Sequence, residues 1–325
     1  MVLFEVRASV VLYNILRSLV KYGHIKKDSI FLLPLNICPI VPAIFLKAGV
    51  KFDFIDISLK TLCIDEGVLL EKINKNKNIK GVLFVKSYGT NYDASNLFIE
   101  IKKIDDNIFI IDDSCLKKPD LDYDIEQSQA DLIIFSTGYS KYVDIGWGGF
   151  GFLKDSYKYD KQHMLFSNSD LMQLTKQMNS SILHGKSFYY VDNNWLGSDT
   201  HLYNSFTEYA KYIKNILPKV TKHKELINDI YKKELNYKVQ MKEEFSNWRF
   251  LIFVNNKEHM LKKIFKAGLF ASSHYKDIGA MYGCNYKDKY TNAKYSHSGI
   301  INLFNDFRFS KKNAYKISKL INNSC

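Results

Sequence analysis

The chain has 325 residues, enough for one large domain or for a large domain and a smaller one. Hydrophobic residues make up 46% and charged residues 25%, a balance typical of folded, water-soluble proteins. The formal net charge is +12, yet the only arginines are Arg7, Arg17, Arg249 and Arg308, so a general lysine bias explains the charge better than nucleic-acid binding does.

Membrane insertion, metal binding and disulfide bonding all lack support in the sequence. The longest apolar runs, such as residues 30–35 and 132–135, are too short to cross a bilayer. The eight histidines show no HxxxH or HExxH spacing, and the five cysteines show no CxxC spacing. Their odd number and the lack of a secretory signal favour a reducing cytoplasm. We therefore expect a cytoplasmic protein that binds no metal, membrane or nucleic acid.

Helices and short apolar strands alternate through the first half of the chain. An amphipathic helix over residues 10–20 comes first. The expected strands cover residues 30–33, 52–55, 81–85, 108–111 and 132–135, and the helices between them residues 39–47, 66–73 and 93–104. The strands are rich in Ile, Val, Leu and Phe and mostly do not alternate, as strands buried on both faces do. This predicts an α/β fold, with a mostly parallel central sheet sandwiched by helices.

The second half is expected to hold a long helix and a smaller unit. Apolar residues recur at helical spacing over residues 199–235, and Pro218 should kink or split that helix. A strand over residues 249–254, a helix over 258–266 and a last helix over 310–321 then suggest a small α+β unit. We expect a large cofactor-binding domain over residues 1–195, then linker helices and a small C-terminal domain over 196–325.

Polar groups follow two of the expected strands. Asp113 ends one, Ser136 ends the next, and Lys141 lies five residues beyond Ser136 in a glycine-rich segment. Ligands of open parallel sheets bind beyond the carboxyl ends of the strands, so these groups are candidates for one site. An amine, a carboxylate and a hydroxyl are groups with which proteins hold pyridoxal 5'-phosphate (PLP). Considered singly, a loop lysine is usually solvated, and a strand-end aspartate usually caps a turn.

A phosphate group could bind near the start of the first helix. Ser9, after Arg7 and Ala8, is a good candidate for the N-cap of that helix, whose free N–H groups and dipole attract anions. Ser136 and Thr137 could add hydroxyls from the opposite side. Most N-cap serines bind no ligand, so this pattern is weak by itself.

Three other positions have both a functional and a structural explanation. Tyr88 could cover a cofactor ring or pack in a turn. His274 and Tyr275 could touch substrate, although a partly buried structural histidine is equally reasonable. Arg249 could pair with a carboxylate or cap a strand. The run from Gly148 to Gly151 lacks the helix and acidic residue of a dinucleotide-binding fingerprint, and no Walker-type loop is present.

Taken in order, these segments resemble the DegT/StrS-type aminotransferases of sugar biosynthesis, which are PLP enzymes of fold type I. The similar segments run from near residue 7 to residue 275. They are Leu33-Pro34-Leu35-Asn36-Ile37-Cys38, Ala48-Gly49 with Phe54-Ile55-Asp56-Ile57, Tyr88-Gly89, Asp112-Asp113-Ser114-Cys115, Phe135-Ser136 through Lys141 to Gly148-Gly149, and His274-Tyr275.

The resemblance implies a role for each candidate residue. Lys141 would hold PLP covalently and transfer the proton, and Asp113 would face the pyridine nitrogen. Ser9, Ala8 and Ser136 would bind the phosphate, and Tyr88 would also contact the cofactor. His274, Tyr275 and Arg7 would contact substrate. Dehydratases of the family carry histidine at the lysine position, so Lys141 favours transamination.

The family also implies the reaction and the partners. An amino group would pass from a donor, expected to be glutamate, to a keto sugar, expected to be nucleotide-linked, in surface polysaccharide biosynthesis by a homodimer. Leu116 and Trp147 stand where the family usually has polar residues, and the Asn-Tyr-Arg element is not recognisable near residues 198–202. Two alternatives remain open: a PLP enzyme acting on a small non-nucleotide keto or amino substrate, and a catalytically retired homologue with a binding role.

Overall fold

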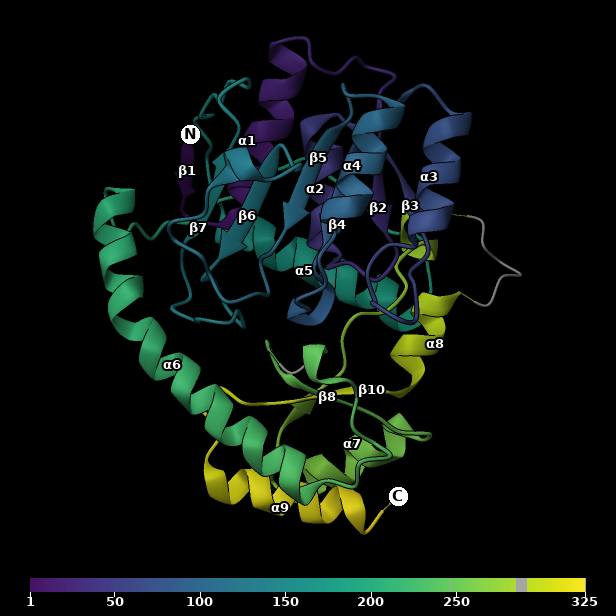
Figure 1. Cartoon of the computed structure of the whole chain (residues 1–325), viewed down its shortest axis with the longest axis vertical. Helices are drawn as coiled ribbons and strands as arrows, with labels where there is room; N and C mark the ends of the chain where they lie inside the picture. The colour runs from purple at the N-terminus through teal and green to yellow at the C-terminus, as the bar shows by residue number, and fades with distance from the viewer. Residues whose placement is uncertain (246, 285–290, 325) are drawn as a thin grey trace.

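The computed structural model describes residues 1–245, 247–284 and 291–324 (Figure 1). Within these residues the larger sheet has seven strands, in the order β1-β7-β6-β5-β4-β2-β3. The strands are β1 (Val2–Glu5), β2 (Ile30–Pro34), β3 (Lys51–Ile55), β4 (Ile79–Val85), β5 (Phe109–Asp113), β6 (Leu132–Ser136) and β7 (Gly149–Leu153).

The sheet is mostly parallel, as the sequence predicts. Strands β2 to β6 all run in one direction, and β7 lies antiparallel between β6 and β1. All five predicted strands are present, with ends shifted by a few residues at most. The two strands that the sequence analysis did not anticipate, β1 and β7, pair with each other from distant parts of the chain.

Helices cover both faces of this sheet. They are α1 (Ala8–Lys21), α2 (Ile40–Ala48), α3 (Glu66–Lys75), α4 (Ser95–Ile104) and α5 (Asn168–His184). Buried residues of α1, α2 and α5 belong to one hydrophobic cluster, and those of α3 and α4 belong to another. Helix α5, which was not predicted, runs behind the large sheet in Figure 1.

Helix α6 (Phe206–Glu234) is continuous through Pro218, so of the two expected outcomes, a kink or a split, the split does not occur. The helix instead curves along one side of the molecule (Figure 1). It begins seven residues later than predicted, at a cap formed by Ser205, whose hydroxyl accepts a hydrogen bond from the Glu208 amide (3.2 Å). Its first half packs against β6 and β7 through Tyr209 and Ile213, and its second half belongs to the core of the smaller unit.

The smaller sheet has the order β8-β10-β9 in the described part of the chain, with β10 antiparallel to both neighbours. Its strands are β8 (Phe250–Phe253), β9 (Ala271–Ser272) and β10 (Ile300–Leu303), and its helices are α7 (Lys257–Lys266), α8 (Asn292–Gly299) and α9 (Lys311–Asn322). Short 3-10 helices cover Ser87–Gly89, Ile125–Gln127, Glu243–Phe245 and Ala280–Tyr282. Strand β10 and helix α8 were not predicted, whereas β8, α7 and α9 were.

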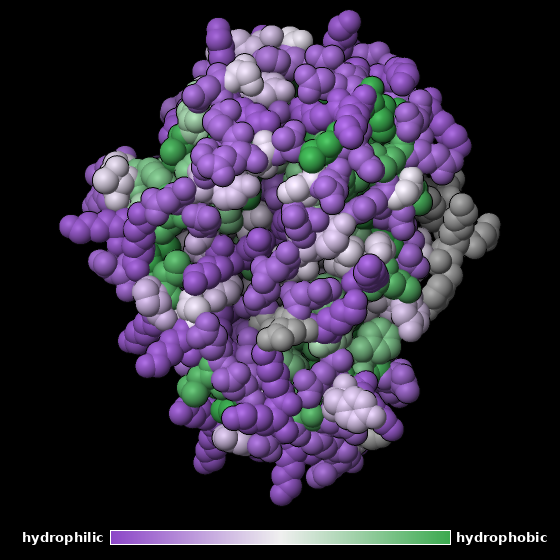
Figure 2. Space-filling model, in the orientation of Figure 1, coloured by the Kyte–Doolittle hydropathy of each residue, from purple (hydrophilic) through white to green (hydrophobic). Residues whose placement is uncertain are grey.

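Hydrophilic side chains cover most of the face shown in Figure 2, and hydrophobic ones lie there in small scattered groups. Among the described helices, not one combines the length and the apolar character that crossing a bilayer requires. Cys38, Cys63, Cys115 and Cys284 are free thiols, and Cys325 lies outside the described residues.

Candidate active site

A cavity of about 290 Å³ lies where the carboxyl ends of β4, β5 and β6 meet the N-terminal ends of α1 and α2. Ligands of open parallel sheets bind at this edge. Most of the residues that the sequence analysis put forward line this cavity, namely Arg7, Ala8, Ser9, Asp113, Ser136, Lys141 and Tyr275. Tyr88 and His274 are not among the described residues that line the cavity.

Two adjacent aspartates at the end of β5 point in opposite directions, because side chains alternate along a strand. Asp113 lines the cavity, and its Oδ1 accepts a hydrogen bond from the Cys115 amide (3.0 Å). Asp112 is buried on the other side, where its Oδ2 lies 3.7 Å from Lys86 Nζ and its Oδ1 accepts from Ser114 Oγ (3.1 Å). Burial raises the pKa of Asp112, and Lys86 opposes that shift.

Lys141 lies in the loop of residues 137–148 that joins β6 to β7. Its side chain lines the cavity, and its amine forms no hydrogen bond or ion pair with any described residue. The loop is held from within by Asp144, whose carboxylate accepts hydrogen bonds from the amides of Ser140 (2.9 Å) and Gly146 (3.1 Å). The amine therefore has no partner in the described part of the chain, while hydrogen bonds from Asp144 hold the backbone around it.

Asp113 and Lys141 both act electrostatically on a third cavity residue, Cys115. Burial raises the pKa of the Cys115 thiol well above its ordinary value; the Asp113 carboxylate raises it further, and the Lys141 ammonium opposes the shift. Cys115, Asp113 and Lys141 all line the cavity. The arrangement brings an acid and an amine to one small, largely apolar space.

The start of α1 forms another part of the cavity wall. Arg7, Ala8 and Ser9 all line it, and the N-terminus of a helix attracts anions. The expectation that Ser9 is the N-cap is wrong: the helix begins at Ala8, so Arg7 holds that position in extended backbone (φ −152°), without a capping hydrogen bond from its side chain. The Val10 and Val11 amides donate to the Arg7 carbonyl (3.0 and 3.3 Å), whereas the Ser9 amide has no acceptor among the described residues. Burial lowers the pKa of Arg7.

Strand β7 fixes this helix end by a very close approach. A Cβ built on Gly149 would lie 1.9 Å from the Ala8 nitrogen, so only glycine fits there. The Gly148 amide also donates to the Val6 carbonyl (2.9 Å). The pair Gly148-Gly149 therefore brings the start of α1 beside the end of β6, where Ser136 lies.

The two hydroxyl residues that end β6 have different environments. Ser136 lines the cavity, and its Oγ accepts a hydrogen bond from the Gly138 amide (3.2 Å). Thr137, expected to add a second hydroxyl, is fully buried away from the cavity, where its Oγ1 donates to the Trp147 carbonyl (2.6 Å) and lies 2.7 Å from the Tyr209 hydroxyl. Thr137 therefore stabilises the loop, and it is not among the described residues that line the cavity.

Tyr88 supports the cavity wall from behind. Its side chain is fully buried; its hydroxyl accepts a hydrogen bond from the Tyr275 amide (2.8 Å) and donates to the His274 carbonyl. Tyr275 lines the cavity, and its ring stacks near-parallel to Trp248 at 6.3 Å. Burial and the charges of Arg249 and Lys141 lower the pKa of His274 to about 4, so its ring is neutral at pH 7.

Arg249 neither lines the cavity nor forms an ion pair among the described residues. It is buried, donates a hydrogen bond to Ser272 Oγ, and lies over the rings of Trp248 (4.5 Å) and Phe304 (3.8 Å). Burial lowers its pKa to about 10. Its role in this structure is to join β8 to β9 and to support Trp248.

Several cavity residues were missed by the sequence analysis. Lys86 directly follows β4 and Asn36 follows β2, so the strand-end rule that identified Asp113 could have identified both. Asn36 Oδ1 is buried without a hydrogen-bond partner among the described residues, although its Nδ2 donates to Leu62 O (2.8 Å). Leu116, Ile37 and Val41 make part of the cavity wall apolar. No short sequence motif predicts this feature.

The donor set fits PLP. An amine without a partner, a carboxylate, a serine hydroxyl and an uncapped helix N-terminus line one cavity, and the Asn36 Oδ1 atom lacks a donor. The cavity is close in volume to the smaller known sites for small molecules. No group of three His, Cys, Asp or Glu side chains that could bind a metal occurs within residues 1–245, 247–284 and 291–324.

Comparison with known proteins gives a clear match in structure only. No protein-family model matches the sequence, and no curated protein matches it. Spr1654 of Streptococcus pneumoniae, named as a sugar aminotransferase, superposes with a TM-score of 0.71 at 16% identity, covering 99% of this chain and 85% of that one. One of the Spr1654 structures is a PLP form.

Two further structures agree. Helicobacter pylori PseC, an aminotransferase involved in the biosynthesis of pseudoaminic acid, gives a TM-score of 0.70 at 17% identity over 100% of this chain and 87% of its own. A DegT DnrJ EryC1 StrS aminotransferase from Brucella abortus gives 0.67 at 16% identity over 99% and 85%. The chain therefore has the fold of PLP-dependent aminotransferases, fold type I, along nearly its whole length.

Proposed function

We propose that this chain is a PLP-dependent aminotransferase of the DegT/StrS type that transfers an amino group to a keto sugar. The observation that carries the proposal is that the amine of Lys141 and the carboxylate of Asp113 line one cavity, together with Ser136 and the uncapped start of α1. The fold shared with sugar aminotransferases supports it.

Each residue has a role that follows from its chemistry. PLP, when bound, supplies an electron sink that makes loss of the substrate's α proton easier. Lys141 Nζ would bond to the cofactor and, once displaced by the donor's amine, accept and return that proton. The Asp113 carboxylate would hold the proton on the pyridine nitrogen. Ser9, Ser136 and the first N–H groups of α1, with Ala8 at its start, would bind the phosphate.

The substrate side would be formed by Arg7 and Tyr275, which line the cavity, with His274 beside them. The Arg7 guanidinium would attract an anionic group, such as the carboxylate of glutamate as donor or the phosphate of a nucleotide-linked keto sugar. A role in surface polysaccharide biosynthesis and a cytoplasmic homodimer complete the proposal. In it, residues 1–195 form the cofactor domain, and residues 196–325 form the linker helices and the small domain. Tyr88, which does not line the cavity, would act on the cofactor indirectly, by holding the backbone of Tyr275.

Titration of the purified protein with PLP tests the central claim. A visible absorbance band should appear with a stoichiometry of one cofactor per chain and should be lost in Lys141→Ala. A second lysine, Lys86, also lines the cavity, although its Nζ lies beside Asp112 and donates to the Tyr92 carbonyl. The bond should therefore be mapped as well: borohydride reduction and peptide analysis should place the cofactor on Lys141. Lys118→Ala, which removes an exposed lysine outside the cavity, is the matched control.

Retention of the band in Lys141→Ala, or reduction onto Lys86, would show that the wrong lysine has been assigned. A wild-type protein that binds no PLP would favour the retired homologue. Conversion of the amine-loaded protein by nucleotide-linked keto sugars, but not by simple keto acids, would support the sugar substrate. The reverse preference would favour a small non-nucleotide substrate.

A further inference from the structure

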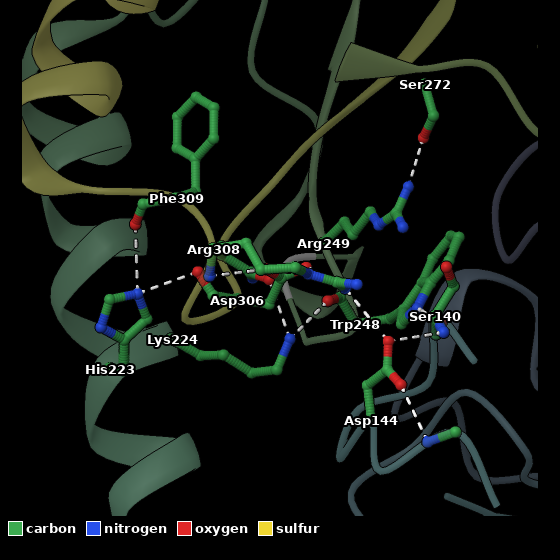
Figure 3. Close-up of polar contacts among 12 residues, drawn as sticks. Ser140, Asp144, His223, Lys224, Trp248, Arg249, Ser272, Asp306, Arg308 and Phe309 are labelled. Atoms are coloured by element: carbon green, nitrogen blue, oxygen red, sulfur yellow. Dashed lines mark hydrogen bonds and ion pairs between the residues drawn. The ribbon is translucent and has the colours of Figure 1, made fainter. Parts of the chain in front are cut away.

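The loop that carries Lys141 is held from the C-terminal part of the chain. Trp248, just before β8, donates a hydrogen bond from Nε1 to the Ser140 carbonyl (2.7 Å). Arg308, after β10, places Nη2 at 3.1 Å from Asp144 Oδ2. Figure 3 shows both contacts converging on the same side of the loop. The residue before Lys141 and the carboxylate three residues after it are therefore both held by residues more than 100 positions away.

Asp144 connects the Arg308 contact to the backbone. The same Oδ2 atom accepts the Ser140 amide (2.9 Å), and Oδ1 accepts the Gly146 amide (3.1 Å). Both amides belong to strained or tight turns, since Ser140 has φ +58° and Gly146 has φ +71°. A non-glycine residue at positive φ persists only where its surroundings impose it. Trp248 acts on the Ser140 carbonyl and Asp144 on its amide, so together they impose this conformation next to Lys141.

Further contacts hold the Arg308 side chain and the Trp248 backbone. Asp306 accepts hydrogen bonds from Arg308 Nε (3.0 Å) and Nη2 (2.9 Å), which orients the guanidinium toward Asp144. Lys224 of α6, which is only 3% exposed, donates to the Trp248 carbonyl (2.9 Å) and to Asn305 Oδ1 (2.9 Å). A guanidinium held by two carboxylates and a buried amine held by two carbonyl oxygens are well-defined anchors.

Trp248 also touches the cavity wall. Its ring stacks on Tyr275, with ring centroids 6.3 Å apart and an angle of 23° between the planes. A displacement of Trp248 would therefore disturb both Tyr275, which lines the cavity, and the backbone next to Lys141.

We propose that Trp248 and Arg308 are positioning residues that hold the Lys141 loop in its reactive geometry and couple it to the smaller sheet. The proposal rests on the proposed function in one respect, the reaction of Lys141 with PLP. Because a misplaced reacting group reacts more slowly, loss of either contact should slow bonding of Lys141 to PLP without abolishing it.

The test uses substitutions that remove one contact each. Trp248→Phe keeps the ring and removes the indole N–H, and Arg308→Met keeps most of the side-chain volume and removes the charge. Trp195→Phe is the matched control for the first, because Trp195 is buried and donates to the Tyr190 hydroxyl (3.3 Å) away from the loop. Arg17→Met is the control for the second, because Arg17 donates to the Ala48 carbonyl (3.4 Å).

Two measurements are compared. Hydrogen–deuterium exchange of the cofactor-free protein should show faster exchange over residues 138–146 in Trp248→Phe and Arg308→Met, but not in the controls. The rate of borohydride-trapped PLP bonding at Lys141 should fall about tenfold, to the same final stoichiometry. Arg308→Lys should recover part of the rate, and Asp144→Asn combined with Arg308→Met should be no slower than the slower single variant.

The outcomes separate the two proposals. A wild-type protein that forms no bond with PLP overturns the proposed function, whatever the exchange data show. A wild-type protein that does bond PLP, with loop exchange and trapping rate unaltered in Trp248→Phe and Arg308→Met, overturns the positioning proposal alone. Equal effects in the control variants also overturn it. If Arg308→Met does not fold, Arg308→Lys and Trp248→Phe provide the same comparison.

Discussion

Asp112 and Asp113 are adjacent in β5, but their identical side chains lie in different environments. Asp113 reaches the cavity, whereas Asp112 is buried beside Lys86 and Ser114. A buried charge without a partner is costly, so Asp112 and Lys86 each depend on the other for stability. Asp113 has one backbone partner, the Cys115 amide, and remains available to a ligand.

Neutralising each aspartate should therefore give different results. Under the proposed function, Asp113→Asn should lower the aminotransferase rate by about a hundredfold or more, because it would remove an electrostatic partner of the reacting cofactor. It should leave thermal stability nearly unchanged. Asp112→Asn should lower the free energy of unfolding by about 3 kcal/mol, because Lys86 loses its counter-charge. Steady-state kinetics and urea denaturation of both variants check this pair. Equal loss of activity at equal stability would contradict the separation of roles.

Strand β7 and the start of α1 approach each other very closely beside the cavity. Strand β1 pairs with β7 over four residues, and the start of α1 follows β1 directly. The N-terminal end of the helix is thus positioned by a strand that lies about 140 residues later in the chain. Gly149 makes this approach possible because a side chain there would overlap the backbone of Ala8.

Two glycine substitutions should have effects of opposite sign. Gly149→Ala should destabilise the protein by about 3 kcal/mol or more, since its Cβ would lie 1.9 Å from the Ala8 nitrogen and no flexible side chain can move aside. Its affinity for PLP should fall as well, because the start of α1, where the phosphate is proposed to bind, would move. Gly67→Ala, in the exposed part of α3 with its nearest contact at 3.5 Å, should stabilise the protein by about 1 kcal/mol. Thermal and urea unfolding of both variants would decide this.

The molecule as a whole is joined by α6, which packs on the large sheet through its first half and on the small sheet through its second half (Figure 1). Lys224 lies in that helix, and its buried amine contacts the segments that flank β8 and β10. Burial lowers the pKa of Lys224 to about 7, while Asp306 opposes the shift and Arg249 and Arg308 add to it.

Lys224 should make the stability of the whole chain depend on pH. Its pKa is about 7 in the folded protein against an ordinary 10.5, so unfolding takes up a proton between these values. The folded state is therefore penalised as pH falls from 10.5 to 7, and the penalty is complete below pH 7. Relative to Lys224→Met, wild-type stability should rise by about 2 kcal/mol between pH 7 and pH 9. Urea denaturation of both proteins at the two pH values measures this; a constant difference would contradict the shift.

The sequence predicted the part of the fold that has strong local signals. The five parallel strands are rich in apolar residues, as in Leu132–Phe135 of β6, and Asp113 and Ser136 at two strand ends indicated where the site lies. Lys141 could be proposed because the resemblance to an aminotransferase family supported it, and its side chain does line the cavity with Asp113. The residue roles themselves stay predictions until the PLP experiments are done.

The other elements and contacts could not be predicted from the sequence, for physical reasons. Strand β7 has two glycines in five residues, which suggested a loop, and α5 buries only Leu174, Met178 and Ser181, which leaves little periodicity. The starts of α5 and α6 did have a signal, since Ser167 and Ser205 each precede an acidic residue by three positions and cap the helix. The contacts of Trp248 and Arg308 with the Lys141 loop join residues more than 100 positions apart, and no local pattern announces such contacts.

The pairing of β1 with β7 has a consequence for how the protein is made. Met1 bonds to Leu153, 152 residues later, so the first strand leaves the ribosome long before its partner is synthesised. Until then the beginning of α1 has no anchor, and contacts of such sequence separation form late in folding. We therefore expect the nascent chain to retain the proposed vitamin B6 cofactor only after translation has passed residue 153.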